Sequence, residues 1–121
     1  MKALIVDDSA GMRAFLRMAL KGAGYEIAEA KNGVEAINLL RSGTTADVAL
    51  LDWNMPEMDG FELLQAIRAD HKFDGIRVVM TTTENEMAQV AKALEAGANE
   101  YIMKPFTREI IVEKLEMVLG S

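Results

Sequence analysis

The sequence contains no cysteine and only one histidine among its 121 residues. Without thiols the chain can form no disulfide bond, no zinc–thiolate site and no cysteine nucleophile. It has no apolar run long enough to span a membrane, and the short apolar segment near its start leads into two aspartates, unlike a signal peptide. We therefore expect a cytoplasmic protein without a membrane partner, which fits the lack of disulfide-forming residues.

Basic residues are in the minority, and the net charge is −6. Such a chain is poorly suited to bind the phosphates of nucleic acids, so we expect no nucleic-acid partner. Half of the residues are hydrophobic, which is enough for one core at this size. With no linker or repeat in sight, we expect a single domain over residues 1–121 and no output domain.

Short apolar runs alternate with amphipathic stretches along the whole chain. The runs that predict strands cover residues 3–6, 25–30, 48–51, 76–80 and 101–103. The stretches with apolar residues at helical spacing cover residues 12–20, 34–40, 61–67, 87–94 and 111–118. Several runs are apolar without alternation, as in strands buried on both faces. Five β–α units predict a doubly wound parallel α/β sheet with helices on both faces.

Reactive side chains follow the predicted strands. Asp7 and Asp8 follow the first, Asp52 the third and Lys104 the fifth, while threonines 81–83 follow the fourth. The carboxyl ends of parallel strands share one edge of the sheet, so these residues are expected to form one shallow site. Three carboxylates repel one another; Lys104 offsets one charge, and Mg²⁺ suits the rest. This combination indicates phosphoryl transfer, in which an aspartate can be the nucleophile.

Three segments together resemble the motifs of response-regulator receiver domains of two-component signalling. They are Val6-Asp7-Asp8-Ser9, the loop from Asp52 to Gly60, and Lys104-Pro105-Phe106. The resemblance covers the whole chain and is greatest to the single-domain receivers of chemotaxis, which share Trp53-Asn54 after the aspartate. It implies a flavodoxin-like fold with strand order 2-1-3-4-5.

The resemblance also implies roles for the site residues. Asp52 would accept the phosphoryl group, and Lys104 would pair with Asp52 and then with the phosphoryl oxygens. The peptide bond after Lys104 would be cis. Asp8 would hold Mg²⁺ directly and Asp7 mainly through a metal-bound water. Asp52 and the backbone carbonyl of Asn54 would complete the metal site.

Further residues would act as a switch or tune the phosphoryl lifetime. Thr82 lies at the required distance along the chain before Lys104, so we assign it the hydrogen bond to the phosphoryl group. Tyr101 matches the aromatic switch position. Asn54 and Glu84 flank the site at positions that tune attack by water. Thr83 replaces the small residue common in the family and is expected to narrow access for the phosphodonor.

The implied partners are proteins. The donor would be a phosphohistidine of a sensor histidine kinase, and the target would be a downstream protein bound in trans, such as a flagellar switch, with a phosphatase as a further candidate. The chain would catalyse only its own phosphorylation and dephosphorylation. A phosphorelay intermediate and a pseudo-receiver, which binds proteins constitutively, are the alternatives within this family.

Three other interpretations are weaker. A haloacid-dehalogenase-like phosphatase needs a second aspartate two residues after the first, where this chain has Asn54. A dinucleotide-binding loop is not supported, because Gly22 and Gly24 follow a predicted helix and Ile27 occupies the place of the third glycine. His71 lies in a polar stretch and is interpreted as a surface residue, not a phosphocarrier.

Overall fold

A computed structural model describes residues 1–120 as strands that alternate with helices. The strands are β1 (Lys2–Val6), β2 (Glu26–Ala30), β3 (Val48–Asp52), β4 (Arg77–Thr82) and β5 (Glu100–Met103). The helices are α1 (Ala10–Gly22), α2 (Gly33–Arg41), α3 (Gly60–Ala69), α4 (Val90–Glu95) and α5 (Arg108–Gly120), with 3₁₀ turns η1 (His71–Phe73) and η2 (Glu84–Gln89). The predicted β–α alternation is confirmed.

All five strands are parallel and run in the order β2-β1-β3-β4-β5. The predicted strand order is therefore confirmed. The direction in which successive strands are added reverses beside β1, so that β1 and β3 form the switch point at which such sheets bind ligands. The register pairs Asp52, the last residue of β3, with Thr81 of β4.

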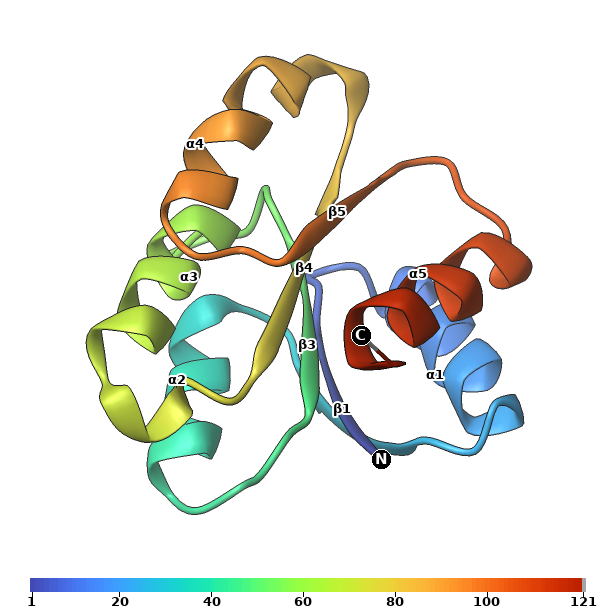
Figure 1. Ribbon diagram of the computed structural model, residues 1–121, viewed down its shortest axis with the longest axis horizontal. Helices are drawn as coiled ribbons and strands as arrows, with labels where there is room; N and C mark the ends of the chain where they lie inside the picture. The colour runs from blue at the N-terminus through green and yellow to red at the C-terminus, as the bar shows by residue number, and fades with distance from the viewer. Residues whose placement is uncertain (121) are drawn as a thin grey trace.

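Helices cover both faces of the sheet (Figure 1). Helices α1 and α5 lie on one face, and α2, α3 and α4 lie on the other. Within β1, Ile5 packs in the core under α1 and α5, and Leu4 packs in the core under α2 and α3. Neither side chain is exposed to solvent. A central strand buried on both faces needs apolar residues at every position, which explains why its sequence does not alternate.

The helices that flank the reactive edge begin at side-chain caps. Asn32 accepts a hydrogen bond of 2.8 Å from the backbone N–H of Glu35 at the start of α2. Ser9 does the same for α1, accepting from the N–H of Met12 at 3.1 Å. Because Ser9 caps α1, the two aspartates before it are not needed for that purpose.

The fourth helix differs from its prediction. Its first part is the 3₁₀ turn η2, and α-helical structure begins only at Val90. Before η2, the backbone N–H and the hydroxyl of Thr83 both donate to the carboxylate of Glu86. Such local bonds satisfy groups that a helix start leaves unpaired, and 3₁₀ turns are frequent there. The apolar spacing could not separate the two helix types over so few residues.

The last helix follows its predicted pattern. Ile111, Leu115 and Val118 of α5 are buried against the sheet. Both α5 and α1 have 13 residues and are the longest helices. No helix formed by residues 1–120 is long and apolar enough to cross a membrane.

Candidate functional site

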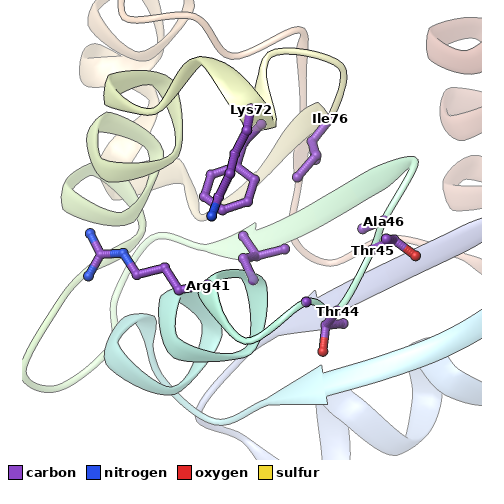
Figure 2. Close-up of a pocket in the computed structure, with 9 residues that line it drawn as sticks. Arg41, Thr44, Thr45, Ala46, Lys72 and Ile76 are labelled. Atoms are coloured by element: carbon purple, nitrogen blue, oxygen red, sulfur yellow. The ribbon is translucent and has the colours of Figure 1, made fainter.

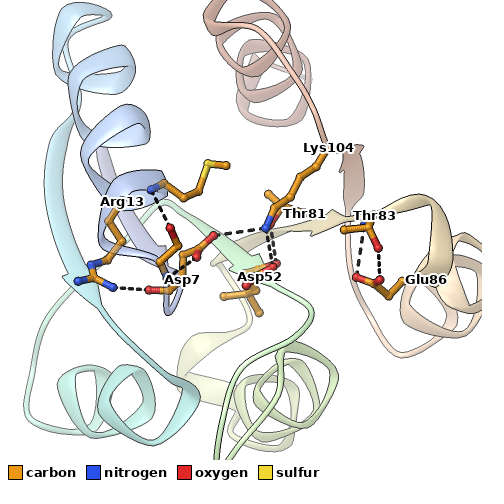
Figure 3. A network of polar contacts seen from close by, with 10 residues as sticks. Asp7, Arg13, Asp52, Thr81, Thr83, Glu86 and Lys104 are labelled. Atoms are coloured by element: carbon orange, nitrogen blue, oxygen red, sulfur yellow. Dashed lines mark hydrogen bonds and ion pairs between the residues drawn. The ribbon is translucent and has the colours of Figure 1, made fainter.

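The carboxyl ends of β1, β3 and β5 bring together three side chains that are far apart in sequence (Figure 3). The ammonium Nζ of Lys104 donates to Oδ1 of Asp52 at 2.8 Å and lies 3.5 Å from Oδ2 of Asp7. Asp7 directly follows β1, Asp52 ends β3 and Lys104 directly follows β5. The parallel sheet thus gathers these residues at one edge, as predicted from the strand ends.

Asp8 completes a cluster of three carboxylates with Asp7 and Asp52. One oxygen from each lies within 4.8 Å of the others. Asp7 and Asp52 are buried, whereas Asp8 is exposed. Oδ1 of Asp7 accepts from the N–H of Ser9 at 2.8 Å, but its Oδ2 is buried without a hydrogen bond. Hard oxygen donors with one unsatisfied buried oxygen fit a divalent cation such as Mg²⁺.

The protonation equilibria at this cluster reflect burial and crowding. Burial raises the pKa of Asp52 to about 6; the hydrogen bond from Lys104 opposes this, and the charges of Asp7 and Asp8 add to it. Burial lowers the pKa of Lys104, but its contacts with Asp52 and Asp7 outweigh burial, and the net shift is upward. At neutral pH, Asp52 is therefore an ionised carboxylate beside an ammonium, as a nucleophile requires.

The raised pKa of Asp52 predicts how stability depends on pH without metal. The folded state keeps this proton up to about pH 6, whereas the unfolded state loses it near the ordinary value of 3.8. The stabilisation is thus fully present below 3.8 and is lost as pH rises through about 6. In urea unfolding with EDTA, the parent should lose stability relative to Asp52→Asn as the pH rises from about 3.8 to about 6, and the difference should level off above that range. A difference in stability between the two proteins that does not change over this pH range would contradict the raised pKa of Asp52.

Lys104 is also anchored through its backbone. Its N–H donates to the carbonyl of Thr82 at 2.6 Å, which ties the end of β5 to the end of β4. The peptide bond between Lys104 and Pro105 is cis, as the resemblance implies. Lys104 is therefore held at two points. Its backbone is bonded to the end of β4, and its ammonium contacts the carboxylates of Asp7 and Asp52.

The threonines after Met80 face different surroundings. The hydroxyl of Thr81 donates to the carbonyl of Leu51 at 3.4 Å. Thr82 is fully buried, and its hydroxyl lies 3.7 Å from the sulfur of Met87 in η2. In this structure the Thr82 hydroxyl therefore contacts η2. Its predicted hydrogen bond to a phosphoryl group on Asp52 stays a prediction.

The residues expected to tune the phosphoryl lifetime lie at the rim. Asn54 and Glu84 are exposed, and Thr83 is half-buried. The Thr83 hydroxyl contacts the carboxylate of Glu86, and Figure 3 shows this pair on the far side of Lys104 from Asp7. The predicted effect of Thr83 on donor access therefore depends on its bulk, since its hydroxyl is engaged elsewhere.

Two other singled-out side chains lie away from the carboxylates. Tyr101 is half-buried, packs against the hydrophobic core and has the ammonium of Lys114 at 5.8 Å from its ring centroid. Its role as a switch stays a prediction. The side chain of His71 is 94% exposed and pairs with Asp74 at 3.1 Å. These surroundings match its interpretation as a surface residue.

Sequence reasoning missed two residues that touch the site. Arg13 of α1 contacts the backbone of Asp7, and Met87 contacts the hydroxyl of Thr82. Neither has a signal in the sequence: an arginine on a helix resembles any surface charge, and the direction of Met87 depends on the 3₁₀ geometry of η2.

A cavity of about 280 Å³ lies near the opposite edge of the sheet (Figure 2). It is an open pocket lined by the end of α2, the turn η1 and the segments that lead into β3 and β4, with Arg41, Thr44, Lys72 and Ile76 in its wall. None of its lining residues is a carboxylate. The acidic cluster is therefore separate from this cavity.

The fold is a doubly wound parallel sheet with an acidic site at its switch point, and comparison with known proteins identifies the class. Residues 3–116 match the response regulator receiver domain family, and the chain belongs to this family. It is 48% identical to the chemotaxis protein CheY1 of Helicobacter pylori strain J99, over all of this chain and 98% of that protein. A chemotaxis protein CheY homolog of Campylobacter jejuni is 47% identical over all of this chain and 94% of its own length.

Solved structures of receiver proteins have the same fold as this chain. The chemotaxis response regulator CheY4 of Vibrio cholerae superposes with a TM-score of 0.90 at 35% sequence identity, covering 98% of both chains. The chain is therefore a two-component response regulator of the CheY-like type.

Proposed function

We propose that this protein is a Mg²⁺-dependent signalling switch that accepts a phosphoryl group on Asp52 and thereby changes its binding to a protein target. The observation that carries the proposal is the position of the Asp52 carboxylate, 2.8 Å from the Lys104 ammonium and beside Asp7 and Asp8. This arrangement presents an ionised nucleophile next to fixed positive charge, at an edge that a donor can approach. It is a switch and catalyses only its own phosphorylation and dephosphorylation.

The chemistry follows from the charges of the site. A carboxylate oxygen of Asp52 attacks the phosphorus of a phosphohistidine on a sensor kinase; the phosphorus–oxygen bond forms and the phosphorus–nitrogen bond breaks. The donor imidazole leaves with the bonding electron pair. Lys104 pairs with the charge on the phosphoryl oxygens, a positioning and electrostatic role typical of such transfer. When bound by Asp7, Asp8, Asp52 and the carbonyl of Asn54, Mg²⁺ would supply the remaining positive charge.

The output is proposed to pass through the surface formed by η2, α4, β5 and α5. Thr82 is the link, because its hydroxyl lies against Met87 of η2 and its carbonyl accepts from the backbone of Lys104. A phosphoryl group that draws the Thr82 hydroxyl away from Met87 would alter the packing of η2, and Tyr101 would respond as the second switch residue.

The proposed target is a separate protein that binds the receiver in trans. The similarity to chemotaxis proteins favours a chemotaxis target, such as a flagellar switch protein, over a phosphorelay role. We propose that a sensor histidine kinase is the donor and that the exchange takes place in the cytoplasm. A phosphatase is a further proposed partner.

The proposal is tested by removing the metal. Incubation with acetyl phosphate and Mg²⁺ should add one phosphoryl group, seen by intact-protein mass spectrometry. Excess EDTA should slow the reaction by about a hundredfold, because a metal ion at such a site stabilises developing charge by several kcal/mol. Phosphoramidate should serve as a second small donor in case the bulk of Thr83 hinders the first.

Failure of both small donors and of a cognate kinase to phosphorylate the protein would contradict the proposal and favour the pseudo-receiver. Equal phosphorylation rates with Mg²⁺ and with EDTA would leave Asp52 as the proposed acceptor but would show that the reaction does not need the metal.

A further inference from the structure

Arg13 reaches back from the first turns of α1 to the turn that carries the two aspartates. Its Nη1 donates to the backbone carbonyl of Asp7 at 2.6 Å, and Figure 3 shows this bond on the side of the acidic cluster opposite Lys104. Arginine presents several donors in a rigid plane, so it can satisfy this carbonyl and still pair with an acid.

The contact completes the restraint of Asp7. The N–H of Asp7 donates to the carbonyl of Ala30 at 3.2 Å, and its Oδ1 accepts from Ser9 at 2.8 Å. With Arg13 on the carbonyl, the only polar atom of Asp7 without a hydrogen bond is Oδ2, which is buried 3.5 Å from the Lys104 ammonium. Every other polar atom of Asp7 has a fixed partner.

The same hydrogen bond restrains the backbone from which the side chain of Asp8 extends. The carbonyl of Asp7 and the N–H of Asp8 belong to one planar peptide unit, so holding the oxygen holds the plane from which Asp8 departs. The side chain of Asp8 is exposed and makes no hydrogen bond or ion pair with the rest of residues 1–120. Its orientation therefore depends on its backbone.

Glu29 of β2 holds Arg13 in this pose. Its Oε1 lies 3.7 Å from Nε of Arg13, and its Oε2 accepts from Nη1 of Arg17 at 2.7 Å. Both arginines thus share one carboxylate, but only Arg13 contacts Asp7. The side chain of Arg13 is 20% exposed and that of Arg17 is 39% exposed, so the first pair is the better shielded from solvent.

We propose that Arg13 is a positioning residue of the cation site, which orients Asp7 and Asp8 through the peptide between them. This inference rests on the proposed function. It predicts a change in cation affinity opposite to the change expected from charge alone. Loss of a nearby positive charge alone should strengthen cation binding, whereas loss of the positioning bond should weaken it.

The experiment is a titration of the purified full chain with Mg²⁺, followed by calorimetry and by the fluorescence of Trp53, which lies next to Asp52. Arg13→Ala is compared with Arg17→Ala, which removes the same charge and contacts the same Glu29 but leaves Asp7 untouched. Removing a residue that orients a metal ligand typically costs 10–100-fold in affinity, so Arg13→Ala should raise the Kd about tenfold. Arg17→Ala should leave it unchanged or slightly lower.

Arg13→Lys retains a positive charge that can donate to the carbonyl but lacks the planar guanidinium, so its Kd should fall between those of Arg13→Ala and the parent. Urea unfolding of each variant sets conditions in which all are folded. Equal Kd values for Arg13→Ala and the parent would overturn the inference, as would equal weakening by Arg17→Ala. If the parent itself binds no Mg²⁺ in either readout, the metal-dependent function fails first, which distinguishes the two failures.

Discussion

Replacement of Asp52 by asparagine is expected to abolish phosphorylation of the protein. Asparagine has nearly the same shape but no carboxylate, so no nucleophile remains 2.8 Å from the Lys104 ammonium. After incubation with acetyl phosphate and Mg²⁺, intact-protein mass spectrometry should show one added phosphoryl group in the parent and none in Asp52→Asn. Hydroxylamine, which cleaves acyl phosphates, should remove the group from the parent.

The variant should fold, because it removes one of three neighbouring carboxylates and leaves Asp7 to pair with Lys104 at 3.5 Å. Two further variants serve as controls. Asp74→Asn makes the same change at an exposed position, where the carboxylate pairs with His71, and it should be phosphorylated like the parent. Asp8→Asn should slow phosphorylation through weaker metal binding yet keep the acceptor.

Phosphorylation of Asp52→Asn at the parent's rate would show that another group is the acceptor. Peptide mapping of the modified protein would then decide between the other two aspartates of the cluster, Asp7 and Asp8, and a residue outside it. Either finding would separate the acceptor assignment from the metal-site assignment, which the Mg²⁺ titration tests independently.

Replacement of Gly60 by alanine is expected to be among the most destabilising single changes at the site. A Cβ at this position would lie 2.3 Å from the backbone oxygen of Asp52 and 3.1 Å from the terminal methyl of Met80. The first contact is with backbone that belongs to the central sheet, so it cannot be relieved by rotating a side chain. The N–H of Gly60 also donates to the carbonyl of Trp53 at 2.9 Å, which locks α3 against the acceptor loop.

Overpacking of this kind should cost about 3 kcal/mol in the free energy of unfolding. For a domain of this size, that corresponds to a fall of about 10 °C in Tm. Calorimetry or thermal circular dichroism would measure it. Gly75→Ala is the matched control, since a Cβ there meets nothing within 4 Å, and its effect should stay within about 0.5 kcal/mol. A Gly60→Ala protein as stable as the parent would show that α3 can shift away from Asp52.

The sequence was a good guide to the backbone and to the charged residues of the site. Strands buried on both faces, helices with one apolar stripe and the β–α alternation all follow from local patterns of apolar residues. Once the strands are parallel, residues that directly follow them must share an edge. Asp7, Asp52 and Lys104 therefore come together without any knowledge of side-chain packing.

The sequence was a poor guide to hydroxyl and guanidinium contacts. Which way Thr82 turns depends on Met87, and the position of Met87 depends on η2 being a 3₁₀ turn. The contact of Arg13 with the Asp7 carbonyl needs the distance between α1 and the end of β1, together with the acid that β2 supplies at Glu29. No periodicity or spacing records such distances.

What the sequence determines by itself is therefore the order of the elements, the family and the identity of the charged groups at the strand ends. The tertiary structure alone decides how deeply each group is buried and which atoms it meets. Burial is the larger cause of the pKa of about 6 at Asp52, and it leaves one oxygen of Asp7 without a hydrogen bond. Desolvation and hydrogen-bond geometry arise only when distant segments pack, because both depend on the complete surroundings of an atom.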